Sequence, residues 1–124
     1  MLYVIHAFDG IYGGLHGMED WSLVDCSTIN EAEEYLRENS MDIITSYSSI
    51  VDQLEADVED YKTDDMSEEE IEELRYDIYN EDVDGNIYQI KKEFSEKYTS
   101  KDFLKFEQEL VKDPEDFIEK YCEK

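Results

Sequence analysis

The sequence predicts an α+β protein in which a small antiparallel sheet of about three strands packs against several helices, one of them long and amphipathic. Three observations predict this class. Short β-branched and aromatic runs flank a glycine-rich segment near the N-terminus, apolar residues then recur at helical spacing, and capping patterns precede later segments. The 124 residues contain no internal repeat and no linker, so we expect one domain over residues 1–124.

Three strands are expected, two near the N-terminus and one after residue 85. Leu2–Phe8 is rich in β-branched and aromatic residues, and Trp21–Cys26 alternates in polarity. The glycine-rich loop Asp9–Met18 lies between them, which predicts an antiparallel hairpin with a long connection. A third strand is expected at residues 86–92, after the turn signal Asp84-Gly85.

A long helical region is expected after the second strand. Thr28–Glu31 fits a capping box, in which a hydroxyl and a carboxylate satisfy free amides at a helix start. The apolar residues that follow predict one amphipathic helix over residues 29–61, or two helices separated near Asn39-Ser40. These residues are Leu36, Ile43, Tyr47, Ile50, Leu54, Val58 and Tyr61.

Further helices are expected in the second half of the chain. Ser67–Glu70 is a second capping box, and a helix with a buried stripe should run from there to the turn at Asp84-Gly85. A helix is expected from about Lys101 to Val111, and Asp113-Pro114 should start another, with Asp as N-cap and Pro in the first turn. The apolar stripes of these two capped helices are Ile71, Leu74 and Ile78, and then Phe117, Ile118 and Tyr121.

The charge of the chain is large and uneven. Asp and Glu number 35 against 11 Lys and Arg, a formal net charge of −24. An acidic helical segment at residues 52–85 holds 16 acids and 2 bases, whereas residues 86–124 hold 10 acids and 8 bases. A salt-adapted protein would spread acid along the whole chain and avoid Lys, and a disordered acidic tail would lack the 13% aromatic content. The segment therefore calls for a local explanation.

The residues that commonly carry catalysis are sparse. His6 and His16 are the two histidines, and His6 falls in a strand where packing is its expected role. Cys26 and Cys122 form no Cys-x-x-Cys motif, so neither a zinc site nor a disulfide framework is indicated. We expect a protein that is not an enzyme and has no catalytic residues, no metal and no cofactor.

Two motifs resemble ligand loops only in part. Residues 80–91 match the middle of an EF-hand calcium loop, but position twelve is Lys91 in place of the bidentate Glu. An ordinary Asp-Gly turn before a strand explains this stretch better. The loop Gly10–Gly17 lacks the P-loop ending and the dinucleotide-binding pattern. It exposes apolar residues that we interpret as a secondary partner contact: Ile11, Tyr12, Leu15 and Met18.

The N-terminal residues carry no basic region and no long apolar run, which argues against a signal peptide. No stretch of the sequence approaches the ~18 apolar residues that a membrane span needs. We expect a cytoplasmic protein without a membrane partner, in the cytoplasm of the host cell if a phage encodes it.

Carboxylates are concentrated in the segment Asp64–Glu73 beyond what a helix needs. Several lie four residues apart, as Glu69 and Glu73 do, and each such pair costs an isolated helix ~0.2–0.5 kcal/mol. If the segment were fully helical, its charges would be spaced at ~2 Å of axis, against ~1.7 Å for duplex DNA. We therefore predict an acidic partner-binding stripe. It comprises Asp57, Glu59, Asp60, Asp64, Asp65, Glu68, Glu69, Glu72, Glu73 and Asp77.

In size, acidity and lack of catalytic motifs, the chain resembles the small phage and prophage anti-defence proteins that mimic DNA, such as anti-restriction proteins and some anti-CRISPR inhibitors. The resemblance rests on Asp57–Asp60 and Asp64–Glu73. It implies a non-catalytic inhibitor that binds the basic nucleic-acid-binding surface of a host defence nuclease, a CRISPR effector or a restriction enzyme, and does not itself bind nucleic acid. The alternatives are a helical adaptor that forms a homodimer through residues 29–61 and a small-molecule-binding phage protein.

Overall fold

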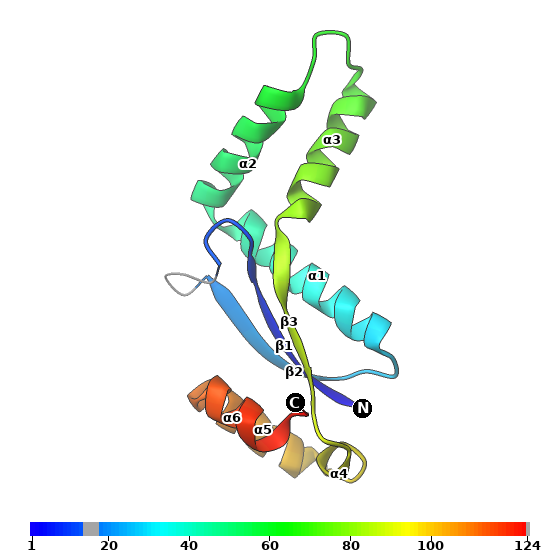
Figure 1. The fold of residues 1–124 in the computed structure, drawn as a ribbon, viewed down its shortest axis with the longest axis vertical. Helices are drawn as coiled ribbons and strands as arrows, with labels where there is room; N and C mark the ends of the chain where they lie inside the picture. The colour runs from blue at the N-terminus through cyan, green and yellow to red at the C-terminus, as the bar shows by residue number, and fades with distance from the viewer. Residues whose placement is uncertain (14–17, 124) are drawn as a thin grey trace.

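The computed structural model describes residues 1–13 and 18–123, and these contain three strands and six helices (Figure 1). The α+β class and the antiparallel three-stranded sheet predicted from the sequence are confirmed. The strands are β1 (Leu2–Asp9), β2 (Glu19–Asp25) and β3 (Val83–Gln89), in the spatial order β2-β1-β3. The helices are α1 (Ile29–Ser46), α2 (Ser48–Tyr61), α3 (Glu68–Glu81), α4 (Lys92–Ser95), α5 (Ser100–Lys112) and α6 (Pro114–Tyr121).

The central strand β1 is buried on both faces and organises two apolar clusters. Tyr3 and Ile5 point to one face, where they meet Ala32 of α1. Leu2 and Val4 point to the other face, which is covered by α5 and α6. That second cluster is completed by Leu23, Ile90, Leu110, Phe117, Tyr121 and Cys122. Because successive strand residues alternate between faces, one strand of eight residues connects both layers of helices.

The region expected as one long helix is two helices, and the break falls at Tyr47, not near Asn39-Ser40. Ser40 is fully buried, and its hydroxyl donates to the Phe8 carbonyl at 2.6 Å and accepts the Asp84 N–H at 3.1 Å. These contacts with the sheet keep α1 helical through Asn39-Ser40, where a break was expected. The chain breaks instead after the β-branched run that ends at Thr45, a composition with low helix propensity.

The third strand begins earlier than expected, because Gly85 lies inside β3 and not in a turn before it. Gly85 pairs with Ala7 and has a φ of 153°. A Cβ atom on this residue would lie 2.3 Å from the His6 carbonyl oxygen and 2.4 Å from a Leu36 methyl group. Glycine is therefore needed here for close approach of the backbone to β1 and α1.

The C-terminus returns to the sheet. The Lys91 N–H donates to the Tyr121 carbonyl at 2.8 Å, and the Glu123 N–H donates to the Gln89 carbonyl at 2.8 Å. As a result, α4, α5 and α6 gather at one end of the molecule, whereas α2 and α3 project from the other end (Figure 1). Within residues 1–13 and 18–123, no helix has the length and apolarity needed to cross a bilayer.

Candidate functional site

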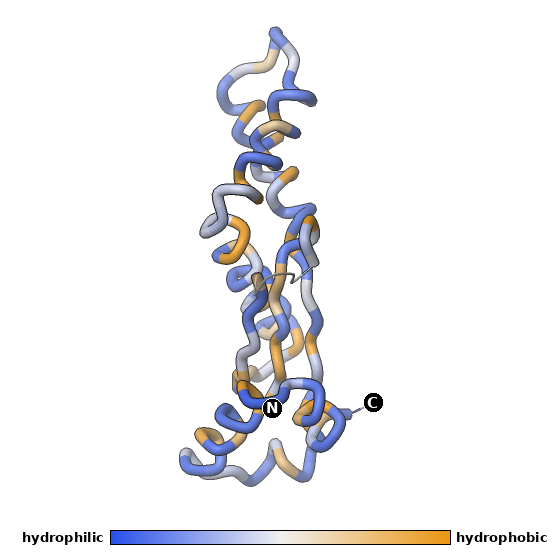
Figure 2. Tube along the Cα trace, turned by 90° about the vertical axis from the view of Figure 1, so that its left-hand side faces the viewer, coloured by the Kyte–Doolittle hydropathy of each residue, from blue (hydrophilic) through white to orange (hydrophobic). Residues whose placement is uncertain are grey.

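The acidic segment folds into two helices that pack side by side and project beyond the sheet (Figure 1). We call residues 48–81, which comprise α2, α3 and the tip loop 62–67, the α2–α3 arm. The arm carries fourteen Asp and Glu residues against Lys62 and Arg75, a net charge of −12 out of −24 for the chain. Its tip is mostly hydrophilic, with one apolar stretch in the turn (Figure 2). Half of the net charge of the molecule is therefore displayed on one protruding element.

The arm is thin, and this limits how deeply its residues are buried. Leu54 and Val58 of α2 are buried. Ile71, Leu74 and Ile78 of α3 are only half-buried, and α3 has no fully buried residue. Ile78 packs against the cluster of Ile44, Ile50 and Leu54, but the prediction that the apolar stripe of α3 is buried is wrong.

The start of α3 follows its sequence signature. The Glu70 N–H donates to the Ser67 hydroxyl at 3.2 Å, and the Ser67 N–H donates to the Glu70 carboxylate at 3.5 Å. This capping box was predicted and is confirmed. Glu68 and Glu69 lie in the first turn with Glu70, where the helix dipole favours negative charge. The stability of the helix start therefore explains the acidic residues in the first turn of α3.

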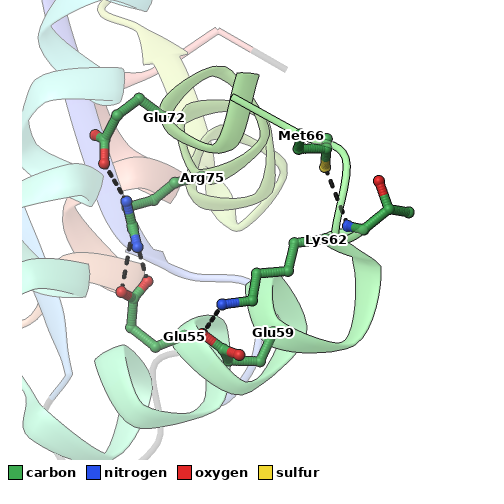
Figure 3. Close-up of polar contacts among 7 residues, drawn as sticks. Glu55, Glu59, Lys62, Met66, Glu72 and Arg75 are labelled. Carbon is green, nitrogen blue, oxygen red and sulfur yellow. Dashed lines mark hydrogen bonds and ion pairs between the residues drawn. The ribbon is translucent and has the colours of Figure 1, made fainter. Parts of the chain in front are cut away.

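A single guanidinium joins the two helices of the arm (Figure 3). Arg75 Nε of α3 donates to both carboxylate oxygens of Glu55 on α2, each at 3.1 Å, and Arg75 Nη1 pairs with Glu72. The Tyr79 hydroxyl donates to the same Glu55 carboxylate at 3.2 Å. The hydrogen bonds from Arg75 hold the pKa of Glu55 below its ordinary value.

Two residues of the predicted stripe are therefore neutralised within the arm. Glu72 pairs with Arg75, and Glu59 pairs with Lys62 at 2.8 Å (Figure 3). Arg75 follows Glu72 by three residues, and helical spacing places the two side chains on the same side of α3. Fewer residues of the predicted acidic stripe are therefore without an ion pair.

Glu69, Glu73 and Asp77 lie four residues apart on one side of α3. They are exposed and have no ion pair with any residue that the structure describes. The exposed Tyr76 ring lies beside them in a shallow hollow that is also lined by Glu73 and Asp77. Like charges at this spacing repel one another. We call Glu69, Glu73, Tyr76 and Asp77 the outer face of α3.

The remaining stripe residues lie around the tip. Asp64 and Asp65 belong to the loop and not to the helix, so the spacing calculated for a continuous helix is not reached. Six carboxylates fall between Glu68 and Asp77, which at ~1.5 Å per residue is one per ~2.5 Å of axis. Asp60, Asp64, Asp65 and Glu68 are exposed and continue the acidic surface over the tip. The charge density remains within a factor of two of the ~1.7 Å per charge of duplex DNA.

Asp57 is separated from the rest of the stripe. It is half-buried and lines a hollow at the base of the arm, together with Glu81 and Asp82. Its carboxylate accepts a hydrogen bond from the Gln53 side-chain amide at 3.4 Å. The structure thus divides the predicted stripe into an outer face, a tip and this basal hollow.

The structure describes three of the four residues predicted as a secondary partner contact in the glycine-rich loop. Tyr12 and Met18 are half-buried and pack against the cluster formed by Ile44, Ile50 and Leu54. Ile11 is exposed and lines the basal hollow, and Leu15 lies outside the described residues.

The other chemical candidates occupy ordinary structural positions. The His6 ring stacks on Trp21 at 3.7 Å and shares a hydrogen bond of 2.6 Å with Glu19, so its predicted packing role is confirmed. Cys26 and Cys122 are buried and free. The segment matching a calcium loop is the end of α3 followed by the extended strand β3, so it has no loop conformation.

Sequence reasoning missed three features of this region. Glu55 is the cross-helix partner of Arg75, and Tyr76 is exposed among the acids of the outer face. Asp9 and Asp82 are buried next to the basal hollow. Tyr76 could have been found from its spacing to Glu69 and Glu73, whereas the other two features depend on contacts between distant segments.

A comparison with protein-family models finds no match, and neither the curated proteins nor the solved structures include a match. Function must therefore be argued from the geometry of the arm.

Proposed function

We propose that the protein is a non-catalytic inhibitor whose α2–α3 arm occupies the basic nucleic-acid-binding surface of another protein in place of DNA. The observation that carries this proposal is the outer face of α3. Glu69, Glu73 and Asp77 are exposed, mutually repulsive, and without an ion pair among the described residues. A basic partner would relieve this repulsion, and nothing within the described fold does so.

The form of the arm supports the same proposal. A projecting pair of helices can enter a groove. The net charge of −12 on its 34 residues attracts a basic surface toward the arm. The exposed rings of Tyr61 and Tyr76 add apolar contact area within the acidic surface. Aromatic side chains of this kind are enriched among the residues that dominate binding energy in protein interfaces.

Within this class, we propose a host defence nuclease as the partner, either a CRISPR effector or a restriction enzyme. Such enzymes bind DNA through Lys- and Arg-lined channels, and the binding of phosphates by those residues is strongly salt-dependent. A stoichiometric inhibitor needs no catalytic group of its own. The phage origin that this identity implies rests on the resemblance in size and acidity to the anti-defence proteins.

The adaptor alternative has less support, because it requires an apolar stripe left exposed on α1 and α2. Ile44, Ile50, Leu54 and Val58 are instead buried within the chain. Among the apolar residues predicted to line the helical region 29–61, Tyr61 alone is strongly exposed, with 70% of its surface accessible, and it lies at the end of α2.

A displacement assay tests the proposal. Labelled duplex DNA is bound to each of a panel of CRISPR effectors and restriction enzymes, and fluorescence anisotropy is followed as the protein is added at low and at high salt. We expect the protein to release DNA from at least one nuclease at low salt and to lose potency as salt rises. Undiminished DNA binding across the panel at low salt would contradict the proposal.

A further inference from the structure

A hollow of about 260 Å³ lies at the base of the arm, where α2, α3 and the loop after β1 meet. Its walls combine apolar and acidic side chains: Ile11, Leu54 and Ile78, and Asp57, Glu81 and Asp82. The volume is below the roughly 300–1,000 Å³ of pockets that hold drug-sized molecules. A single side chain of a partner is a ligand of the right scale.

Asp82 in the wall of this hollow and Asp9, whose charge acts on Asp82, are buried carboxyl groups with unsatisfied oxygens. Asp9 is fully buried and Asp82 is 7% exposed, and the Oδ2 atom of each lacks a hydrogen-bond partner among the described residues. The second oxygen of Asp9 accepts the Tyr12 N–H at 2.7 Å. Buried polar groups in proteins are nearly always paired, so a cation that reached these two orphaned carboxylate oxygens would supply the partner that each lacks.

The surroundings of Asp82 supply negative charge from every side. Burial and the nearby charge of Asp9 raise the pKa of Asp82 to about 6, although backbone N–H groups of the loop oppose the shift. Asp84 on β3 raises it further. Asp57 on α2 and Glu81 on α3 line the hollow itself. A cation placed there would lie near carboxylates of α2 and of the C-terminal end of α3.

We propose that this hollow binds the cationic end of a Lys or Arg side chain from the basic partner. The aliphatic stem packs on Ile11, Leu54 and Ile78, and the charged head reaches Asp82, with Asp57 and Glu81 at the same hollow. Lys and Arg side chains commonly bury their stems while their charges remain paired. This inference rests on the proposed function, and it assigns the base of the arm as the specific contact and the outer face as the steering surface.

A metal ion fits the site less well. The described residues contain no group of three or more His, Cys, Asp or Glu side chains that could hold a metal, and calcium takes six to eight oxygen ligands. A side-chain cation needs only one or two carboxylates and uses the apolar walls as well.

The test uses N-acetyl-lysine amide as the probe, with N-acetyl-norleucine amide as the uncharged match for its stem. The ¹³C signal of the Asp82 carboxyl carbon is titrated with pH in the whole protein at constant ionic strength. We expect the lysine probe, and not the norleucine probe, to lower the titration midpoint of Asp82, because an opposite charge favours the ionised form. It should also shift the methyl signals of Leu54 and Ile78.

Three variants locate the effect. Asp82→Asn should abolish the methyl shifts, and Asp57→Asn, which leaves the buried pair intact, should weaken probe binding about two- to fivefold. Glu33→Gln removes one exposed charge outside the arm and should leave binding unchanged. Equal loss in Glu33→Gln and Asp82→Asn, or no shift in the wild-type protein, would overturn the inference. So would calcium at millimolar concentration producing the same shifts, because the site would then be a metal site.

The outcome is separable from the proposed function. If the hollow binds no cation but the protein still displaces DNA from a nuclease, the inference fails and the inhibitor proposal stands. If the hollow binds the probe but no nuclease loses DNA, the inhibitor proposal fails.

Discussion

Arg75 and Glu55 connect the two helices of the arm, with Arg75 Nε 3.1 Å from both oxygens of the Glu55 carboxylate. The residues are twenty positions apart, and Arg75 also pairs with Glu72 in its own helix. The only Arg of the arm is thus used to hold α2 and α3 together. The outer face, on the same helix, receives no such partner among the described residues.

The first prediction concerns this cross-link. Arg75→Gln should lower the free energy of unfolding by about 1 kcal/mol, because the pair is partly exposed but connects two elements by charge-assisted bonds. Urea denaturation measures the change. Arg37→Gln is the control, since the one ion pair of Arg37 among the described residues is with Glu34 in its own helix, and it should cost less. Equal losses in the two variants would show that the connection between helices adds nothing.

The second prediction follows from the raised pKa of Asp82. Its folded-state pKa of about 6 lies above the ordinary 3.8, so the folded protein is penalised as pH rises through this interval. Asp82→Asn removes the penalty and should stabilise the protein above pH 6 by up to about 3 kcal/mol. The gain should shrink as pH falls toward 4 and vanish only about one pH unit below 3.8, where the wild-type group is protonated in both states.

The difference between wild-type and Asp82→Asn free energies of unfolding, measured by denaturation across pH 4–7, gives the result. A difference that is independent of pH would contradict the assignment of the raised pKa to Asp82.

The third prediction concerns repulsion on the outer face. Glu73 lies four residues from both Glu69 and Asp77, so Glu73→Gln should raise the free energy of unfolding by a few tenths of a kcal/mol at low salt. The gain should disappear in 1 M salt, where the Debye length is ~3 Å. Denaturation at two salt concentrations measures it. A loss of stability at low salt would mean that Glu73 has a stabilising contact.

The fourth prediction concerns Gly85. Gly85→Ala places a Cβ 2.3 Å from the His6 carbonyl oxygen and should cost at least about 2 kcal/mol, from the contact and from the strained backbone together. Gly13→Ala is the matched control, because Gly13 has a φ of 62° but no atom of the part of the chain that the structure describes lies within 4 Å of its added Cβ. It should cost about 1 kcal/mol. Melting temperatures of the two variants should differ in this order.

Local signals in the sequence predicted the parts of the fold that depend on neighbouring residues. The capping patterns at Thr28, Ser67 and Asp113 each mark a helix start in the structure. The end of α1 was misplaced, because the buried hydroxyl of Ser40 is held by two strands that are distant in sequence. Propensity cannot anticipate such a contact.

The candidate site shows the same division. The sequence shows the acidity of the arm, and the three-residue spacing of Glu72 and Arg75 indicates their pairing on one side of a helix. The link to Glu55 and the burial of Asp9 beside Asp82 depend on how α2, α3 and β1 meet. No spacing along the chain specifies these contacts.

The most direct test of the central claim combines charge reversal with DNA displacement. The triple variant Glu69→Lys, Glu73→Lys, Asp77→Lys is compared with Glu33→Lys, Glu38→Lys, Glu119→Lys, which reverses three exposed carboxylates outside the arm and changes net charge equally. Circular dichroism first establishes that both are folded. In the low-salt anisotropy assay with a nuclease that responds to the wild type, we predict that the outer-face variant no longer releases DNA, whereas the control variant still does. Equal potency of the two variants would contradict the claim that the arm is the binding surface.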